Sequence, residues 1–203
     1  MAKNFASIGF STAARQLQEK YGSRQSYARM EKDSYVDGLT EKETDFIAER
    51  DSFYIASIGE NGFPYIQHRG GPKGFLKVLD NKRLGFIDFK GNMQYITAGN
   101  LATNNKVALI MVDYPSRTRL KIFARAGMAE LAGHQELYNA LNLEDYKFRP
   151  ESMMVLHIEA YDWNCPQHIV PRYTVEEIEK ALAPQRAYIA KLEAEIKVLK
   201  SPA

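Results

Sequence analysis

The hydrophobic positions of this chain follow two different periods, and the change comes near residue 52. Residues 11–22 ("STAARQLQEKYG") have the composition of a short helix closed by Gly22. Residues 39–51 predict a second helix, in which Thr40 and Glu43 have the spacing of a capping box. From residue 52 onward, apolar, β-branched and aromatic residues alternate with polar ones, which is typical of half-buried strands.

Four alternating stretches predict a series of β-hairpins and one further strand. The stretches and their turns are 52–69 with Asn61-Gly62, 74–89 with Asp80 to Lys82, 106–131 with Tyr114 to Arg117, and 152–163. About seven strands result, and strands joined by short turns must be antiparallel. A barrel is the expected arrangement, because closure removes exposed edges.

Three more segments have helical patterns, and they are residues 92–105, 133–143 and 174–200. The last one starts with a Thr174/Glu177 capping box and contains Pro184, which is expected to kink or split it. Its second half carries apolar residues at 3-4-3 spacing, a pattern that fits either a dimer seam or packing on the chain's own body. These residues are Ile189, Leu192, Ile196 and Leu199.

Composition and charge narrow the class of protein. The chain has 203 residues, of which 45% are hydrophobic and 26% charged, with a net charge of +2, so nothing indicates a nucleic-acid partner. The single cysteine, Cys165, excludes an internal disulfide and favours a reducing compartment. No signal-peptide pattern and no run of ~18 apolar residues is present. We therefore expect a soluble cytoplasmic protein without a membrane or nucleic-acid partner.

The segment 68–77, "HRGGPKGFLK", combines three glycines with positive charge at a strand-to-strand connection. Gly70 and Gly71 would let backbone amides approach a ligand closely. Arg69 and Lys77 would reach phosphate oxygens from the flanking strands. The alternative is a flexible loop with solvated charges.

A second candidate for anion binding is the connection Lys90-Gly91-Asn92, between a predicted strand and a predicted helix. Asn92 is a favourable N-cap, and a glycine-led helix N-terminus offers free amides to an anion. Because the strand from Phe75 should pair with the strand that ends near Phe89, Lys77 is expected close to this turn. An ordinary strand-to-helix cap is the alternative.

Two further segments carry polar groups that could serve a ligand. Arg119, Lys121 and Arg125 share one face of a strand, either as a solvated exterior or as cations for an anionic ligand. Residues 162–172, "DWNCPQHIVPR", could contact the edge of a flat heteroaromatic ring. Cys165 near His168 also allows a nucleophile, although no residue is placed to orient the pair.

The remaining signals are negative. The four histidines, His68, His134, His157 and His168, have no metal-ligand spacing, so no metal site is predicted. His157 lies inside an apolar strand and is expected to be a core or interface residue. The dinucleotide fingerprint and the P-loop are absent. The residues alone therefore indicate an antiparallel barrel with a small phosphate-bearing ligand.

Three motifs carry a resemblance to a known family. "QHRGGPKGFLK", "GNMQYITAGNL" and "CPQHIVPR", within residues 40 to 175, together resemble the pyridoxamine 5'-phosphate oxidase-like, FMN-binding split-barrel family. The resemblance implies a mainly β fold, a six-stranded antiparallel split β-barrel followed by a C-terminal helix. It divides the chain into an N-terminal extension (1–39), the FMN-binding split barrel (40–173) and a helical tail (174–203).

The resemblance also implies a homodimer with FMN at the subunit interface. The flavin phosphate is expected at basic residues and at the turn before the helix, with polar contacts along the flavin edge and the C-terminal segment beside the ring. The residues carried over are His68, Arg69, Gly70, Gly71, Lys77, Gly91, Asn92, Gln94, Arg119, Lys121, Gln167 and His168. No catalytic residue is assigned, and His168 is the best candidate.

Two departures from the oxidases bear on function. Asn92 and Met93 stand where the oxidases have an Arg-Lys pair, and "CPQHIVPR" stands in place of their C-terminal substrate-binding arginine motif. The leading hypothesis is therefore an FMN-dependent oxidoreductase with an unidentified small-molecule substrate. The alternatives are a pyridoxamine 5'-phosphate oxidase, a flavin-binding or sensing module without turnover, and a split barrel that holds haem or a deazaflavin. In the haem case, His157 would be the axial ligand.

Overall fold

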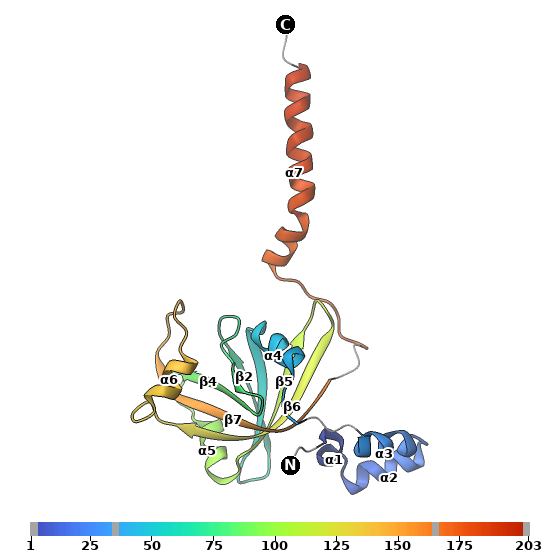
Figure 1. Ribbon diagram of the computed structural model, residues 1–203, viewed down its shortest axis with the longest axis vertical. Helices are drawn as coiled ribbons and strands as arrows, with labels where there is room; N and C mark the ends of the chain where they lie inside the picture. The colour runs from blue at the N-terminus through green and yellow to red at the C-terminus, as the bar shows by residue number, and fades with distance from the viewer. Residues whose placement is uncertain (1–3, 34–36, 164–166, 201–203) are drawn as a thin grey trace.

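A computed structural model describes residues 4–33, 37–163 and 167–200. Its centre is one antiparallel sheet with the strand order β2-β1-β5-β6-β7-β4-β3 (Figure 1). The strands are β1 (Ser52–Ile58), β2 (Pro64–Gly70), β3 (Lys77–Asp80), β4 (Arg83–Phe89), β5 (Lys106–Asp113), β6 (Thr118–Ala129) and β7 (Pro150–Trp163). The mainly β class and the antiparallel pairing are confirmed. The expected six-stranded barrel is wrong, because the sheet has seven strands and is open.

Each predicted hairpin turn is confirmed by local geometry. Gly62 adopts a φ of 80° between β1 and β2, a conformation that favours glycine. The Asp80 carboxylate accepts a hydrogen bond from the Lys82 backbone N–H at 2.8 Å in the next turn. Arg117 has a φ of 55° between β5 and β6. The turns therefore account for the three hairpin pairs, β1 with β2, β3 with β4, and β5 with β6.

The sheet curls around a core of aromatic rings. Phe53 stacks on Phe75 with ring centroids 5.6 Å apart and meets Phe86 edge-on at 5.4 Å. The outermost strands, β2 and β3, share no ladder among the described residues. Instead, Arg69 of β2 forms an ion pair with Asp88 of β4 across the opening. Side chains therefore bridge the place where a closed barrel would have backbone hydrogen bonds.

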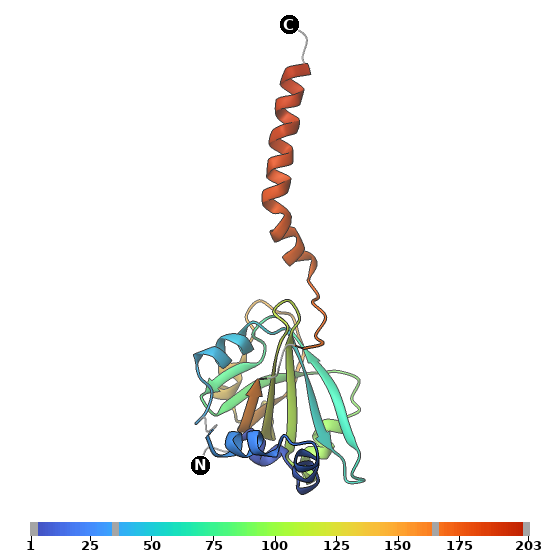
Figure 2. The same cartoon turned by 90° about the vertical axis from the view of Figure 1, so that its right-hand side faces the viewer.

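Seven helices are found in the described ranges. They are α1 (Phe5–Gly9), α2 (Thr12–Lys20), α3 (Arg24–Asp33), α4 (Glu41–Ala48), α5 (Ile96–Thr103), α6 (Gln135–Leu141) and α7 (Val175–Lys200). The helices predicted within 11–22, 39–51, 133–143 and 174–200 are confirmed, whereas α1 and α3 were not predicted. Phe5 of α1 stacks on Phe123 of β6 at 4.4 Å, which holds the N-terminal helices against the sheet (Figure 2).

Helix α4 is joined to the end of β7 through one buried carboxylate. Glu43 completes the predicted capping box with Thr40. Its carboxylate also accepts hydrogen bonds from Trp163 Nε1 at 2.6 Å and from the Tyr161 hydroxyl at 3.2 Å. Burial alone would raise the pKa of Glu43, but hydrogen bonds from Thr40, Trp163 and Tyr161 outweigh it and lower the pKa.

Helix α7 extends away from the rest of the molecule in both views (Figures 1 and 2). Its capping box is present, because Thr174 and Glu177 exchange hydrogen bonds at 2.7–3.2 Å. Pro184 lies inside the helix but does not split it. Packing of this tail on the chain's own body is not observed. No described helix combines the length and the apolarity needed to cross a bilayer.

Candidate functional site

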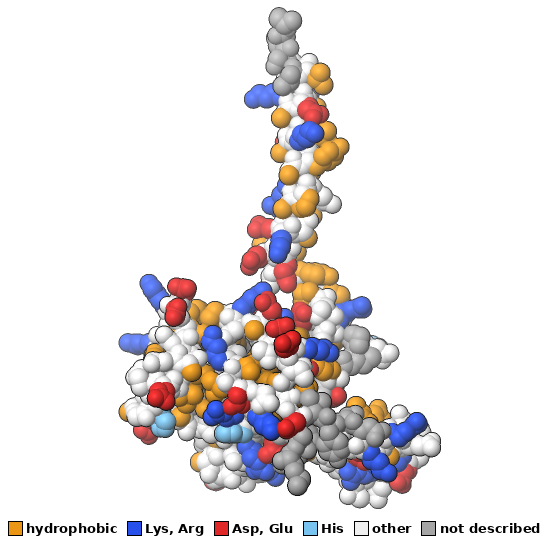
Figure 3. Space-filling view, viewed as in Figure 1, with side chains coloured by type: hydrophobic (Ala, Val, Ile, Leu, Met, Phe, Trp, Pro, Cys, Tyr) orange, Lys and Arg blue, Asp and Glu red, His pale blue; other side chains and the backbone are white. Residues whose placement is uncertain are grey.

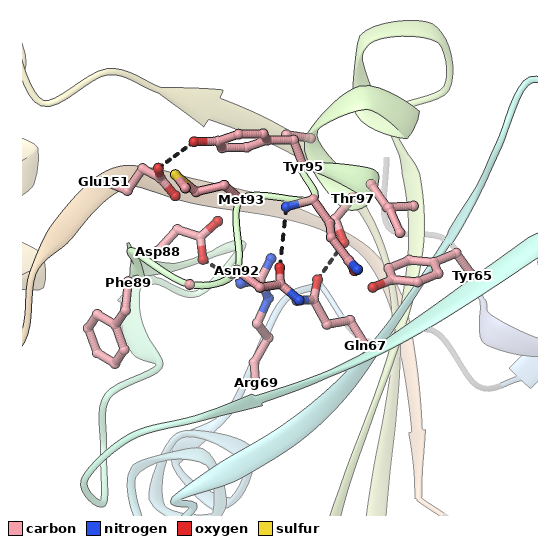
Figure 4. A pocket seen from close by; sticks show the side chains of 14 residues that line it. Tyr65, Gln67, Arg69, Asp88, Phe89, Asn92, Met93, Tyr95, Thr97 and Glu151 are labelled. Atoms are coloured by element: carbon pink, nitrogen blue, oxygen red, sulfur yellow. Dashed lines mark hydrogen bonds and ion pairs between the residues drawn. The ribbon is translucent and has the colours of Figure 1, made fainter.

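A small cavity lies between β2 and the connection from β4 to α5 (Figure 4). It encloses about 60 Å³. Its lining is polar at the base, where β2 contributes, and is formed by the connection and the first turn of α5 above. The lining residues are Tyr65, Gln67, Arg69, Asp88, Phe89, Gly91, Asn92, Met93, Gln94, Tyr95, Ile96, Thr97, Ala98 and Glu151.

Arg69 is the cation of this cavity, and it extends from β2 toward the connection (Figure 4). Strand alternation explains its direction, since Tyr65, Gln67 and Arg69 occupy every second position of β2. Arg69 pairs with Asp88, and the two side chains are only 15% and 14% exposed. The Arg69 Nε atom is buried and has no hydrogen-bond partner among the described residues. The guanidinium therefore has a donor that the described residues do not use, which is uncommon for a buried polar group.

The connection above Arg69 has an unusual backbone. Met93 and Tyr95 adopt φ values of 59° and 53°, in the left-handed region that few non-glycine residues occupy. The Asn92 side chain accepts a hydrogen bond from the Gln94 backbone N–H at 3.2 Å. The prediction that Asn92 caps the helix is therefore wrong, because α5 begins at Ile96 and its N-cap residue is Tyr95. The left-handed residues delay the start of the helix by one turn.

The first turn of α5 faces the cavity. Ile96, Thr97 and Ala98 all contribute to the lining, and the amides of a first helical turn have no acceptor within the helix. Thr97 is 3% exposed, and its hydroxyl donates a hydrogen bond to Gln67 Oε1 at 2.8 Å. This bond ties α5 to β2. The arrangement of free amides beside a guanidinium is suited to an anion.

Two carboxylates, from Asp88 and Glu151, reduce the positive charge that Arg69 brings to this cavity. Burial raises the pKa of Asp88 above its usual range; the neighbouring Arg69 opposes the shift and Glu151 adds to it. Glu151 also accepts a hydrogen bond from the Tyr95 hydroxyl at 2.7 Å, which raises the pKa of that tyrosine. Any anion that enters must therefore compete with Asp88 for Arg69.

His68 and Gly70 line an adjoining cavity of about 150 Å³, which shares Arg69 with the first. Gly71 lines neither cavity. A Cβ atom on Gly71 would lie 2.8 Å from Phe75 Cβ, and its N–H is already bonded to the Asp51 carbonyl at 2.9 Å. Close packing against Phe75 therefore explains why position 71 has a glycine.

Lys77 is not brought to the Gly91-Asn92 turn, contrary to expectation. It pairs with Gly85, not with the end of β4. Six residues separate Gly85 from Gly91, which corresponds to ~20 Å along an extended chain. Lys77 lines neither of the two cavities.

Arg119 and Lys121 lie on the outer face of the sheet. Lys121 pairs with Asp162 at 2.9 Å and lies 4.6 Å above the Phe5 ring. The Arg119 Nε atom is buried without a hydrogen-bond partner among the described residues. Neither residue lines the cavity at Arg69.

The C-terminal candidates lie apart from both cavities. Gln167 and His168 are exposed between β7 and α7, and His168 has a φ of 65°. Cys165 lies outside the described residues. His157 is exposed on β7, so it is not a core residue of this chain, whereas an interface role stays a prediction. His157 does not line either cavity at Arg69. No group of three potential metal ligands occurs in the described ranges.

Several lining residues were not predicted, and they include Gln67, Thr97, Asp88 and Glu151. Gln67 was detectable, because it shares the period-two face of β2 with Arg69. Asp88 and Glu151 had no such signal. They come together because β4 pairs with β7, with Asp88 opposite Ser152.

Comparison with known protein families identifies the family of this chain. The family model described as pyridoxamine 5'-phosphate oxidase matches residues 39–163. The chain belongs to the pyridoxamine 5'-phosphate oxidase family. The match begins just before α4 and ends at the last residue of β7, so it includes every element that lines the cavity. A search of curated protein sequences found no match.

Solved structures of this fold are similar at low sequence identity. HupZ from Group A Streptococcus is 14% identical, with a TM-score of 0.50, and the match covers 66% of this chain and 100% of that one. A protein named for pyridoxamine 5'-phosphate oxidase from Lactobacillus delbrueckii is 23% identical, with a TM-score of 0.48 and coverage of 63% and 95%. An FMN-binding protein from Syntrophomonas wolfei is 12% identical, with a TM-score of 0.45 and coverage of 72% and 97%.

Proposed function

We propose that this member of the pyridoxamine 5'-phosphate oxidase family binds FMN and holds the flavin phosphate at Arg69. The observation that carries the proposal is Arg69, whose side chain lines the cavity and whose buried Nε atom has no hydrogen-bond partner among the described residues. The first-turn amides of α5 and the connection at Gly91 supply further donors. These groups fit a terminal phosphate.

Asp88 is the group that must release Arg69 when the phosphate binds. Its raised pKa means that the carboxyl takes up a proton at lower cost than an exposed aspartate would. Once protonated, Asp88 no longer competes for the Arg69 guanidinium. This property compensates in part for the absence of cations at Asn92 and Met93.

The cavity suits a phosphate but not a whole flavin. Its volume of about 60 Å³ is small beside the ~300–1,000 Å³ of typical ligand pockets. The ring therefore has to extend beyond it, and a second copy of the chain would complete the enclosure. An apolar outer face supports this homodimer, since Ile66 is 65% exposed, Tyr54 is 44% exposed, and both border a groove of about 220 Å³.

Other expected contacts belong to the same proposal. Arg119 and Lys121 lie on this outer face and would contact the flavin edge, and the unpartnered Arg119 Nε atom supports that role. Gln167 and His168, exposed in one chain, would lie beside the ring of the second chain.

We further propose an oxidoreductase that acts on a small molecule, and bound FMN would supply hydride or single-electron chemistry. The protein's residues bind and orient the flavin and shield it from water. Loss of flavin absorbance on addition of a nicotinamide nucleotide would support turnover. Retained flavin that no electron donor reduces would favour a binding or sensing module.

The direct test is FMN affinity in three variants, measured by calorimetry after flavin removal. Arg69→Ala should weaken binding about ten- to hundredfold, because one charge-assisted contact to phosphate is lost. Arg83→Ala is the matched control, since Arg83 is exposed and pairs with Asp80 at 2.6 Å. Unchanged affinity in Arg69→Ala, or a larger loss in Lys77→Ala, would mean that the phosphate lies elsewhere.

A further inference from the structure

Helix α7 presents an apolar stripe that nothing in its own chain covers. Every residue from Val175 to Lys200 whose exposure is known is exposed. In Figure 3, hydrophobic side chains can be followed along the length of the projecting helix. With a rise of 1.5 Å per residue, its 26 residues span ~39 Å. The surface is therefore long, narrow and available for a partner.

The spacing of the stripe is that of a coiled coil. Apolar residues alternate at intervals of three and four along the whole helix, with one polar interruption at Gln185. In heptad notation, the a positions are Val175, Leu182, Ile189 and Ile196, and the d positions are Ile178, Gln185, Leu192 and Leu199. After Pro184, β-branched residues occupy a and leucines occupy the last two d positions. This combination favours two parallel strands over higher assemblies.

The residues beside the seam point to a second copy of the same helix. Glu195 occupies a g position and Lys200 the following e position. In a parallel, in-register pair, Glu195 of each helix would face Lys200 of the other, which is the charge pairing that selects orientation. Gln185 would meet its own equivalent, so that each amide has an amide partner. In an antiparallel pair, the contact between Glu195 and Lys200 and the contact between the two Gln185 side chains would both be absent.

The rest of the helix is compatible with this seam. Pro184 occupies an outward c position, so its ring does not enter the interface. Ala187 and Ala194 occupy outward f positions, and Lys191 and Glu195 form an i,i+4 pair at 3.9 Å. No charged residue stands at an a or d position from Val175 to Leu199.

We propose that α7 forms a parallel, in-register, two-stranded coiled coil with α7 of a second copy of this chain. The two copies would then be joined at their C-terminal helices, in addition to any contact between their sheets. If the sheets also associate, the helices are held at millimolar effective concentration, which favours a seam of this short length. The proposal does not depend on flavin binding.

Disulfide crosslinking of the full chain tests the orientation directly. Leu192→Cys and Leu199→Cys are made separately in a Cys165→Ser background, so that each protein has one thiol. In a parallel, in-register pair, both residues meet their own equivalents within the ~4.4–6.8 Å between Cα atoms that a disulfide requires. Both variants should therefore form covalent dimers under mild oxidation. Because α7 is exposed, neither change should impair folding.

Ala194→Cys is the matched control, since position f faces away from the seam. We expect about tenfold less covalent dimer from this variant than from Leu192→Cys. Crosslinking at only one of the two d positions would indicate an antiparallel pair, because 192 and 199 cannot both meet their equivalents there. Equal crosslinking in the control, or none in any variant, would also overturn the proposal. Flavin content does not affect these outcomes.

Discussion

Two carboxylates lie near opposite ends of β7, Glu43 buried and Asp88 partly buried, and their surroundings differ. Glu43 is surrounded by donors from Thr40, Tyr161 and Trp163, and its pKa is lowered in spite of burial. Asp88 accepts a hydrogen bond from Arg69 alone among the described residues, and burial raises its pKa. A buried acid that is fully hydrogen-bonded stabilises the fold, whereas one with too few donors remains responsive to ligand and pH.

The largest expected effect belongs to Glu43. Glu43→Ala should lower the free energy of unfolding by about 3 kcal/mol, because it removes the N3 half of the capping box, leaves the Trp163 indole N–H without an acceptor and leaves the Tyr161 hydroxyl only the Gly38 carbonyl. Urea unfolding followed by circular dichroism measures this. Glu41→Ala, on the same first turn but exposed, is the control and should change little. If Glu43→Ala lowered the free energy of unfolding only slightly, the structural role that we assign to Glu43 would be wrong.

The second effect concerns ligand affinity at Asp88. Asp88→Asn removes the carboxylate that competes for Arg69, so FMN should bind about tenfold more tightly, or ~1.4 kcal/mol. Calorimetric titration at neutral pH measures the change. Weaker binding would mean that Asp88 itself holds the ligand.

The two acids should also respond to pH in opposite directions. A lowered pKa in the folded state means that the contribution of Glu43 is present at neutral pH and is lost as the pH falls below the usual glutamate range. A raised pKa means that Asp88 favours folding when protonated, and this contribution is lost as the pH rises through its pKa. The difference in unfolding free energy between wild type and Asp88→Asn should therefore vary as the pH rises from about 4, the usual aspartate pKa, through the raised pKa of Asp88. A constant difference would contradict the shift.

The smallest effect is expected where α5 meets β2. Thr97→Val keeps the side-chain shape but removes the hydrogen bond to Gln67, which should cost about 1 kcal/mol of unfolding free energy. Thr103→Val, exposed at the other end of α5, is the control. A change as large as that of Glu43→Ala would show that the cavity contributes as much to stability as the α4–β7 contact does.

Local chemistry made much of this fold predictable. Asn61-Gly62 and the Thr40/Glu43 capping box act within a few residues, so the hairpin and the start of α4 were correctly located. The start of α5 was predicted too early, because the left-handed conformations of Met93 and Tyr95 leave no recognisable pattern.

The candidate site was less predictable because its partners are distant in sequence. Arg69 was identified from its charge, but Asp88 became its partner only through the curvature of the sheet. Gly71 was assigned to ligand approach, whereas its lack of a side chain is required by Phe75. Lys77 was expected near the Gly91-Asn92 turn, but it pairs with β4 at Gly85, several residues before that turn.

The position of Trp163 gives the protein a built-in optical probe. It is the only tryptophan of the chain, with its indole 2.6 Å from the Glu43 carboxylate, edge-on to Phe46 at 4.8 Å and beneath the Lys42 ammonium at 4.5 Å. Its emission wavelength should therefore follow the opening of the α4–β7 contact during denaturation. Eleven residues along β7 separate it from Ser152, which lies opposite Asp88. Events at the cavity should accordingly leave that wavelength unchanged.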